Sequence, residues 1–237
     1  MKIIGIIPSR YKSSRFPGKP LANILGQSMI QRVYEQCKKC ILLDDVIVAT
    51  DDKRIYKHVI GFGGKTMMTS ETHESGTDRC NEVAQKLYVN YDLIVNIQGD
   101  EPFINPKQIE QIISLFDNDT TQIGTLAKKI KDIKIVTDKN NPKAIFDSNN
   151  NALNFCRIIS SPVEKKAYFK HIGIYGYLTK TLAEICELPP SENEIKECLE
   201  QLRWLDNGYK IKVGITTFES LSVDTPEDII KIEAQIR

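Results

Sequence analysis

The sequence predicts an α/β fold with a doubly wound, mainly parallel sheet. Two observations lead to this prediction. Short apolar segments alternate with amphipathic segments through the first half of the chain. The apolar segments are continuous, as expected for strands that are buried on both faces. At 237 residues the chain suits one large domain, and we expect a single domain over residues 1–237.

The expected elements follow in regular order. The first strand, "KIIGIIP", is followed by an amphipathic segment with helical spacing, and the same alternation repeats three times. The second helix is expected to end at the glycines near position 61. Strands are expected near 2–8, 45–50, 65–69 and 92–100, and helices near 28–40, 52–61, 77–89 and from Pro106 onward.

From about residue 121 to 178 the pattern changes to strand-like segments separated by turns rich in Asn and Asp. The segment "KAIFDSNNNALNFC" predicts a hairpin. We expect this β-rich sub-region to cover a site or to form a contact between subunits. Helices are then expected at 179–187 and 193–206, a strand at 210–216 and a final helix from about 225.

Composition narrows the class of protein. The 32 basic residues nearly balance the 31 acidic ones, so a nucleic-acid or membrane partner is not expected. The chain has no run of about 18 apolar residues and its start does not resemble a signal peptide, which predicts a cytoplasmic location. Cys37 and Cys40 form the only close cysteine pair. Without a second pair, reduced cysteines on a helix are favoured over a zinc site.

Polar loops follow four of the expected strands, at 8–20, 50–52, 69–79 and 98–102. In parallel sheets, ligands bind beyond the carboxyl ends of the strands. The first loop, "PSRYKSSRFPGKP", combines turn-forming residues with four cations, a composition suited to phosphate oxygens. It matches neither the Walker A motif nor the GxGxxG motif. The alternative is a solvated basic turn, and Lys12 is expected to be a surface residue.

Two carboxylates are candidates for a metal site. Asp100 follows an apolar strand in "VNIQGDEPF", a position suited to Mg²⁺, which takes one or two carboxylates together with phosphate oxygens. Gly99 would allow the backbone to approach a ligand closely. The alternative for this motif is a polar turn before a helix. Asp224, in "VDTPED", is a second candidate, and its alternative is the N-cap of the last helix.

Other polar residues have both structural and functional interpretations. Ser75 or Thr77 is expected to cap a helix, and Arg79 in its first turn indicates an anionic partner. For His73 we expect a hydrogen bond within its loop. His171 and Tyr175, four residues apart on a strand, are expected to face the same side. Core packing is the alternative for that pair, and a surface ion pair for Glu200 and Arg203.

Taken together, these segments resemble the 3-deoxy-manno-octulosonate cytidylyltransferase family. The resemblance rests on an ordered set of motifs from residue 2 to about 230: "IIPSRYKSSRFPGKPL", "VIVATDD", "MTSETHESGTDR", "VNIQGDEPF", "HIGIYGY", "LEQLRW" and "VDTPEDI". The segment "SRFPGKP" is shared more widely among sugar cytidylyltransferases. The later motifs are more specific in combination.

The resemblance implies a fold like that of nucleotide-diphospho-sugar transferases and a Mg²⁺-dependent reaction. CTP and 3-deoxy-D-manno-octulosonate (Kdo) would give CMP-Kdo and diphosphate, activating Kdo for lipopolysaccharide synthesis. The sugar 2-hydroxyl would attack the α-phosphorus in line, with metal ions assisting the hydroxyl and the departing diphosphate. The family is typically a homodimer, and the β-rich sub-region is where we expect the contact.

The resemblance also assigns roles to individual residues. Lys19, Asp100 and Asp224 would be catalytic, with Asp100 and Asp224 as the metal ligands. Residues expected to bind CTP are Pro8, Ser9, Arg10, Ser14, Arg15, Lys19, Ser75, Thr77, Arg79 and Gln98. Residues expected to bind the sugar are Gln98, Arg157, His171, Tyr175, Glu200 and Gln201.

One region departs from the family pattern. The stretch after Arg157, over 158–170, is shorter than the family usually carries, which leaves the preferred octulosonate open. Alternatives within the enzyme class are an amino-substituted Kdo or a nonulosonic acid as substrate. A nucleotide-binding regulator would not need Lys19, Asp100 and Asp224. A glycosyltransferase would need an Asp-x-Asp motif, which "TDD" and "GDE" do not supply.

Overall fold

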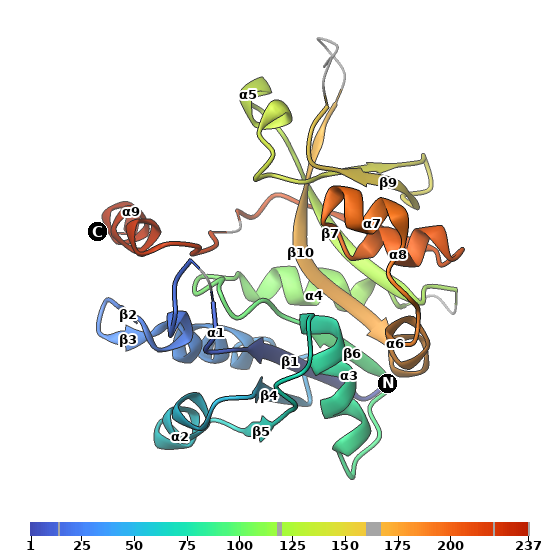
Figure 1. Ribbon diagram of the computed structural model, residues 1–237. Helices are drawn as coiled ribbons and strands as arrows, with labels where there is room; N and C mark the ends of the chain where they lie inside the picture. The colour runs from blue at the N-terminus through green and yellow to red at the C-terminus, as the bar shows by residue number, and fades with distance from the viewer. Residues whose placement is uncertain (14, 118–119, 160–166, 220, 237) are drawn as a thin grey trace. The chain divides into compact units, whose positions relative to one another are not determined.

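The computed structural model describes residues 1–13, 15–117, 120–159, 167–219 and 221–236 (Figure 1). Its contacts divide the chain into two compact units. The first comprises Met1–Glu110 with Ser220–Arg237, and the second comprises Gln111–Glu219. The expected α/β class is confirmed, because both units combine strands with helices. A single domain over residues 1–237 stays a prediction.

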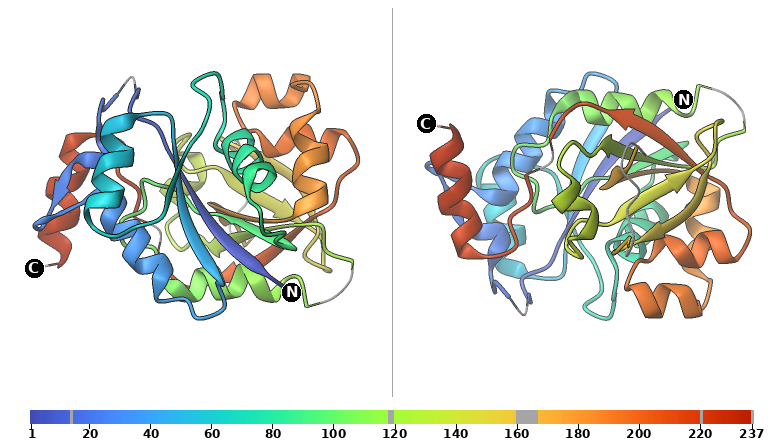
Figure 2. Two further views of the ribbon diagram at one scale, coloured as in Figure 1. Left: turned by 90° about the horizontal axis from the view of Figure 1, so that it is seen from below. Right: turned by 90° about the horizontal axis from the view of Figure 1, so that it is seen from above.

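The first unit contains a parallel sheet with the strand order β6–β1–β4–β5. In both views of Figure 2, β1 and β4 run side by side in blue. Their apolar runs are fully buried, as at Ile4, Ile6 and Ile7. Because all four strands run the same way, their carboxyl ends share one edge of the sheet. The strands are β1 (Ile3–Ser9), β4 (Asp45–Thr50), β5 (Thr66–Met68) and β6 (Leu93–Asn96).

Helices cover both faces of this sheet. Leu43, just after α1, lies over Gly5 of β1, whereas Gly76 at the start of α3 lies over Pro8. Gly5 and Pro8 are three positions apart on one strand and so face opposite sides. Side-chain oxygens of Ser28, Asp52 and Ser75 cap α1, α2 and α3 respectively. The helices are α1 (Met29–Lys38), α2 (Lys53–Gly61), α3 (Gly76–Lys86) and α9 (Pro226–Ile236); α4 (Pro106–Ser114) spans the boundary of the units.

The chain after β1 forms short elements that the sequence did not predict. A 3₁₀ helix, η1 (Lys19–Leu21), precedes a small hairpin of β2 (Asn23–Ile24) and β3 (Gln27–Ser28). A buried cluster joins Ile24 and Met29 from this region to Val223 and Ile232 from the C-terminal segment. This packing brings the C-terminal segment next to the loop after β1.

The second unit contains a mixed sheet. Strand β10 is antiparallel to β7, and β11 is parallel to β7. The expected hairpin is present as β8 and β9. The register between β10 and β7 shifts between Ile172 and Tyr175, which marks a β-bulge. The strands are β7 (Ile123–Lys129), β8 (Lys143–Phe146), β9 (Ala152–Cys156), β10 (Phe169–Leu178) and β11 (Ile211–Thr216).

The prediction of a single helix at 193–206 is wrong. The segment forms two helices, because Cys198 adopts a left-handed conformation with φ 51° that ends the first of them. Arg203 forms an ion pair with Glu194 of the first of these helices, with an N–O distance of 2.6 Å. The helices of this unit are α5 (Ile133–Thr137), α6 (Thr179–Cys186), α7 (Glu192–Glu197) and α8 (Gln201–Asp206).

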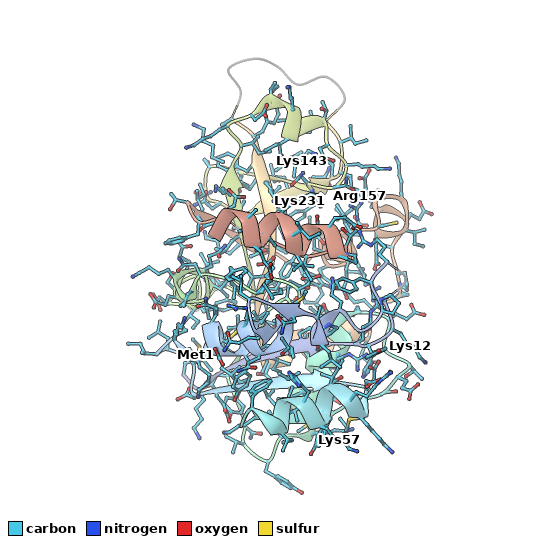
Figure 3. The ribbon with its side chains drawn as sticks, turned by 90° about the vertical axis from the view of Figure 1, so that its left-hand side faces the viewer. Met1, Lys12, Lys57, Lys143, Arg157 and Lys231 are labelled. Carbon is cyan, nitrogen blue, oxygen red and sulfur yellow. The ribbon has the colours of Figure 1, made fainter. Side chains whose placement is uncertain are left out.

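A buried lysine holds the base of the β8–β9 hairpin. The ammonium of Lys143 donates to the main-chain carbonyls of Asp138 and Asn141, each at 2.8 Å, and to that of Arg157. Figure 3 labels Lys143 and Arg157 in this region. Burial lowers the pKa of Lys143, since its ammonium contacts carbonyl dipoles and no carboxylate among these partners.

No helix in the described part of the chain is both long enough and apolar enough to cross a membrane.

Gly176 of β10 provides a test of packing in the second unit. A Cβ there would lie 2.7 Å from both Ile112 and Phe116 side-chain atoms, so we expect Gly176→Ala to destabilise the protein by about 1–3 kcal/mol. Gly61→Ala is the control, since a Cβ at that position would meet no atom within 4 Å. Urea unfolding measures both variants. Equal stability of the two would contradict the close packing around Gly176.

Candidate active site

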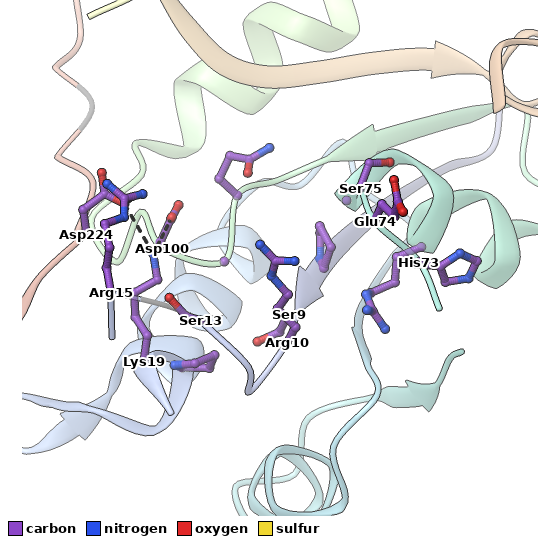
Figure 4. Close-up of a pocket in the computed structure, with 16 residues that line it drawn as sticks. Ser9, Arg10, Ser13, Arg15, Lys19, His73, Glu74, Ser75, Asp100 and Asp224 are labelled. Carbon is purple, nitrogen blue, oxygen red and sulfur yellow. Dashed lines mark hydrogen bonds and ion pairs between the residues drawn. The ribbon is translucent and has the colours of Figure 1, made fainter. Parts of the chain in front are cut away.

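An open cavity of about 250 Å³ lies in the first unit, at the carboxyl ends of β1 and β6 (Figure 4). It gathers residues from the loops after β1, β5 and β6 and from the segment before α9. Of the residues expected to form the site, it is lined by Pro8, Ser9, Arg10, Arg15, Lys19, Ser75, Arg79, Gln98, Asp100 and Asp224. Residues that the sequence did not assign to the site complete the lining: Ser13, Pro20, His73, Glu74, Gly76 and Gly99.

Lys19 connects the two candidate metal carboxylates. Its ammonium lies 2.7 Å from Asp100 Oδ2 and 3.8 Å from Asp224 Oδ1. It also donates to the carbonyl of Val223 at 2.8 Å. Arg15 Nη2 lies 2.9 Å from the same Asp224 oxygen. The expected grouping of Arg15, Lys19, Asp100 and Asp224 is therefore present in the structure.

The loop after β1 is folded back on itself, which positions Lys19. The Gly18 amide donates to the Tyr11 carbonyl at 3.0 Å. Gly18 has φ 73°, and a Cβ there would lie 3.0 Å from the Tyr11 ring, so the turn requires glycine. The guanidinium of Arg54 lies 3.3 Å from the centre of the Tyr11 ring. Lys12, by contrast, is exposed, as the sequence predicted.

Asp224 does not use its carboxylate to cap α9. Asp228 Oδ2 accepts hydrogen bonds from the amides of Asp224 and Thr225, at 3.1 and 3.0 Å, and from the Thr225 hydroxyl. The capping function that was the alternative for Asp224 thus belongs to Asp228. This leaves the Asp224 carboxylate facing Arg15 and Lys19 (Figure 4).

The two carboxylates should differ in their effect on stability. We expect Asp228→Ala to lower the free energy of unfolding by about 1 kcal/mol, because it removes the cap of α9. Asp224→Ala should change it by less than about 0.5 kcal/mol, since the ion pair with Arg15 is solvent-exposed. Urea unfolding of the two variants measures the difference. A larger loss for Asp224→Ala than for Asp228→Ala would restore the capping role of Asp224.

The loop after β6 lies very close to the end of β1. Strand β6 ends at Asn96, so Gln98, Gly99 and Asp100 stand on a loop, where a strand over 92–100 was expected. A Cβ at Gly99 would lie 2.8 Å from the Pro8 carbonyl oxygen, and only glycine avoids this clash. Gly99 therefore serves the approach of two protein backbones at the edge of the pocket.

Arg79 has its anionic partner within the chain. Its side chain is only 3% exposed, and Nη2 lies 3.0 Å from Asp51 Oδ2. Nη1 donates to the Thr69 hydroxyl and to the Ser70 carbonyl. Ser75 caps α3 as expected, by accepting from the Asp78 amide at 3.0 Å. Arg79 thus lines the pocket while its guanidinium holds the preceding loop.

Glu82, one turn further along α3, also binds this loop. It accepts from the Ser70 amide at 2.8 Å, from His73 Nε2 at 2.5 Å and from Lys86. Burial opposes ionisation, but these hydrogen bonds outweigh it and lower the pKa of Glu82 to about 2. His73 makes a hydrogen bond as expected, but its partner is Glu82 of α3 and not a residue of its own loop. Sequence reasoning missed Glu82, although its spacing of three from Arg79 places both on one helix face.

The lowered pKa of Glu82 predicts a pH effect on stability. Its folded pKa of about 2 lies below the ordinary value of 4.5, so its stabilisation is complete above about pH 4.5 and is lost as the pH falls toward 2. When the pH is lowered from about 6.5 to about 3.5, the free energy of unfolding of the unchanged protein should fall. The fall for Glu82→Gln should be smaller by about 1 kcal/mol. Urea unfolding at both pH values measures this. Glu71→Gln, in the same loop, is the control, and equal losses in Glu82→Gln and the unchanged protein would refute the assignment.

In the second unit, three of the residues expected to bind a sugar lie near one another: His171, Tyr175 and Glu200. The rings of His171 and Tyr175 are 5.4 Å apart, and Phe155 lies against His171 at 5.1 Å. Burial lowers the pKa of His171 to about 3. Burial and the nearby Glu200 carboxylate raise the pKa of Tyr175 well above its usual value. At neutral pH this cluster therefore holds a neutral imidazole and a neutral phenol.

The remaining expected residues have varied surroundings. Gln201 is buried, and its Nε2 has no hydrogen-bond partner within the described ranges. Each of the three guanidinium nitrogens of Arg157 donates to a carbonyl, of Glu197, Cys198 or Lys139. Arg157 thus ties the end of β9 to the break between α7 and α8. Thr77 is buried in α3 and does not line the pocket; Ser14 and residues 160–166 of the shortened stretch lie outside the described residues.

Comparison with known proteins identifies the family. The family model for cytidylyltransferases matches residues 4–211. A 3-deoxy-manno-octulosonate cytidylyltransferase of Parabacteroides distasonis is 52% identical over 98% of this chain and 96% of its own length. The chain belongs to the 3-deoxy-manno-octulosonate cytidylyltransferase family. A solved structure of CMP:2-keto-3-deoxy-manno-octonic acid synthetase complexed with CTP superimposes with a TM-score of 0.94 at 39% identity, covering 100% of this chain and 98% of the other.

The family also includes relatives with a different sugar in their names. An 8-amino-3,8-dideoxy-manno-octulosonate cytidylyltransferase of Shewanella halifaxensis is 47% identical over 100% of this chain and 99% of its own length. The similarity to both kinds of cytidylyltransferase extends over essentially the whole chain. Family membership therefore fixes the type of reaction more firmly than the identity of the sugar.

The carboxylates of this cytidylyltransferase suit a magnesium ion that is shared with a nucleotide. Within the described residues, no cluster of three or more His, Cys, Asp or Glu side chains could hold a metal by itself. Asp100 and Asp224 already share one cationic group, the ammonium of Lys19. Mg²⁺ commonly takes one or two carboxylates and completes its shell with phosphate oxygens and water. The donor set therefore fits Mg²⁺ bound together with a triphosphate.

Proposed function

We propose that this chain transfers a cytidylyl group from CTP to Kdo, giving CMP-Kdo and diphosphate. The 2-hydroxyl oxygen of the sugar forms a new bond to the α-phosphorus as its proton leaves. The bond from the α-phosphorus to the bridging oxygen breaks, and diphosphate departs with the electron pair. Family membership and a CTP-bound relative at 39% identity support the reaction.

The grouping of Lys19, Asp100 and Asp224 carries the proposal. These residues come from three separate segments and meet at the edge of the sheet where nucleotides bind in α/β folds. Phosphoryl transfer depends chiefly on positioning and on neutralising charge, so a nucleophilic side chain is not required. A cationic loop facing two carboxylates provides both functions.

We assign the triphosphate to Arg15 and Lys19. Both side chains line the pocket and both contact Asp224. Asp100 and Asp224 would hold Mg²⁺, which when bound supplies positive charge beside the phosphates. The ammonium of Lys19 would then offset charge on the transferring group. Arg15 is 66% exposed, which leaves its guanidinium accessible to an incoming phosphate.

The nucleoside part of CTP is assigned to the end of the pocket near β1. Pro8, Ser9 and Arg10 line it together with Ser75 and Gln98. Ser9 is 4% exposed, and its hydroxyl has no partner in the part of the chain that the structure describes, which makes it available to a ligand or a water molecule. The contacts of Arg79 favour an indirect role in nucleotide binding, because its guanidinium holds the loop that lines the pocket.

In the second unit we assign the sugar to the residues that the family resemblance indicates there. His171, Tyr175, Glu200 and Gln201 offer hydrogen-bonding groups suited to a polyhydroxylated acid, and they match the positions that the family resemblance indicates. Relatives at 50–52% identity are named for Kdo, whereas the Shewanella relatives named for its 8-amino variant are 46–47% identical, which supports Kdo. We also propose a cytoplasmic homodimer that activates Kdo for lipopolysaccharide synthesis, in keeping with the family.

The reaction can be tested by diphosphate release. We expect the unchanged protein to release diphosphate from CTP with Kdo and Mg²⁺, and to turn over Kdo faster than 8-amino-Kdo or a nonulosonic acid. Replacing CTP by ATP, GTP or UTP should reduce the rate strongly. A higher kcat/KM for 8-amino-Kdo would favour that sugar as the substrate, and no release with any acid sugar would refute the proposal.

Asp100→Ala is the matched variant for this assay. Removing a metal carboxylate should lower kcat by at least about a hundredfold while the unfolding transition stays intact. Glu71→Ala, a carboxylate outside the pocket, should keep most of the activity. Retention of activity in Asp100→Ala would remove the role proposed for the carboxylate pair.

A further inference from the structure

Thr125 of β7 occupies an unusual position beside the β-bulge of β10. Its side chain is fully buried. Its hydroxyl oxygen lies 2.9 Å from the Ile174 carbonyl, 3.2 Å from the Ile172 carbonyl and 3.1 Å from His171 Nε2. One hydroxyl thus meets two backbone acceptors and one ring nitrogen. Of these four residues, only His171 was expected from the sequence to belong to a binding site.

Counting protons determines the direction of these hydrogen bonds. A threonine hydroxyl has one proton to donate and two lone pairs that accept. The two carbonyls can only accept, so the hydroxyl proton must lie on their side to avoid placing oxygen lone pairs against each other. The contact with His171 then requires a proton on Nε2, which donates to the hydroxyl oxygen.

The state of the ring follows from its surroundings. His171 is packed against Phe155 and Tyr175, with the Glu200 carboxylate near Tyr175. Burial lowers the pKa of His171 to about 3, so the ring carries a single N–H at neutral pH. With that proton on Nε2, Nδ1 keeps its lone pair. Nδ1 makes no hydrogen bond to the described residues, and it is an acceptor.

We propose that Thr125 is a positioning residue that fixes His171 as its neutral Nε2–H tautomer, so that Nδ1 accepts a hydrogen bond from a hydroxyl of the acid sugar. The proposal rests on the proposed function, which assigns His171 to the sugar. It adds a direction to that contact: His171 accepts, and the sugar hydroxyl donates. A sugar with an ether or a deoxy carbon at that position would lose the contact.

Thr125→Val and Thr125→Ser form a matched pair of variants. Valine has nearly the shape of threonine but cannot accept from Nε2–H, whereas serine keeps the hydroxyl. We expect Thr125→Val to raise the KM for Kdo about tenfold, with the KM for CTP changed less than about twofold. Thr125→Ser should stay within about threefold of the unchanged protein for both substrates. A KM for Kdo unchanged in folded Thr125→Val would overturn the proposal.

The tautomer itself can be observed by ¹⁵N NMR of the histidine rings. The chain has three histidines, so His58→Gln and His73→Gln variants assign the signals. We expect His171 in the unchanged protein and in Thr125→Ser to carry its proton on Nε2, with Nδ1 unprotonated. In Thr125→Val the Nδ1–H form should become populated. A His171 ring with the proton on Nδ1 in the unchanged protein would refute the proposal, even if Thr125→Val failed to fold.

The two measurements separate this inference from the proposed function. An Nε2–H tautomer in a protein that does not turn over Kdo would leave the hydrogen bonds in place and refute the function. Turnover of Kdo by a protein whose folded Thr125→Val variant keeps its KM for Kdo would keep the function and refute the role of Thr125.

Discussion

The site depends on one electrostatic arrangement, the ammonium of Lys19 between two carboxylates. The carboxylates of Asp100 and Asp224, each within 4 Å of this ammonium, would repel each other if no cation lay between them. Lys19, largely buried, provides that cation and also bonds the Val223 carbonyl. The loop after β1, the loop after β6 and the segment before α9 are therefore held together by charge as well as by the apolar cluster beneath them.

A second set of charges acts inside the protein. Arg79 and Glu82, on one face of α3, bond the carbonyl and the amide of Ser70 respectively. Asp51 neutralises Arg79, Lys86 neutralises Glu82, and His73 shares a hydrogen bond with Glu82. These bonds fix the loop that contributes His73, Glu74 and Ser75 to the pocket. Arg79 thus shows that a cation at the binding edge of a sheet can hold a loop of the pocket. Its effect on a ligand would then be exerted through that loop.

The sequence predicted most elements because their signals are local. Continuous apolar runs marked the strands, and Ser75 marked the start of α3 with a side chain that accepts a backbone N–H. The helix expected at 193–206 failed because the break arises from a left-handed Cys198, a residue type that carries no such signal. The capping role considered for Asp224 failed for a similar reason. Asp228 stands four residues later, and its carboxylate accepts from the amides of Asp224 and Thr225 before the helix.

By itself, the sequence determined the α/β class and, through its motifs, the family, and it indicated the candidate site residues. These follow from the order and type of residues along the chain. Only the tertiary structure decided which charges pair. Arg15 meets Asp224 across 209 positions, Lys19 meets Asp100 across 81, and Arg79 meets Asp51 across 28. The hydroxyl of Thr125 meets His171 in the same way, across 46 positions. Pairs so distant along the chain leave no local pattern, because their geometry exists only once the strands and loops have packed.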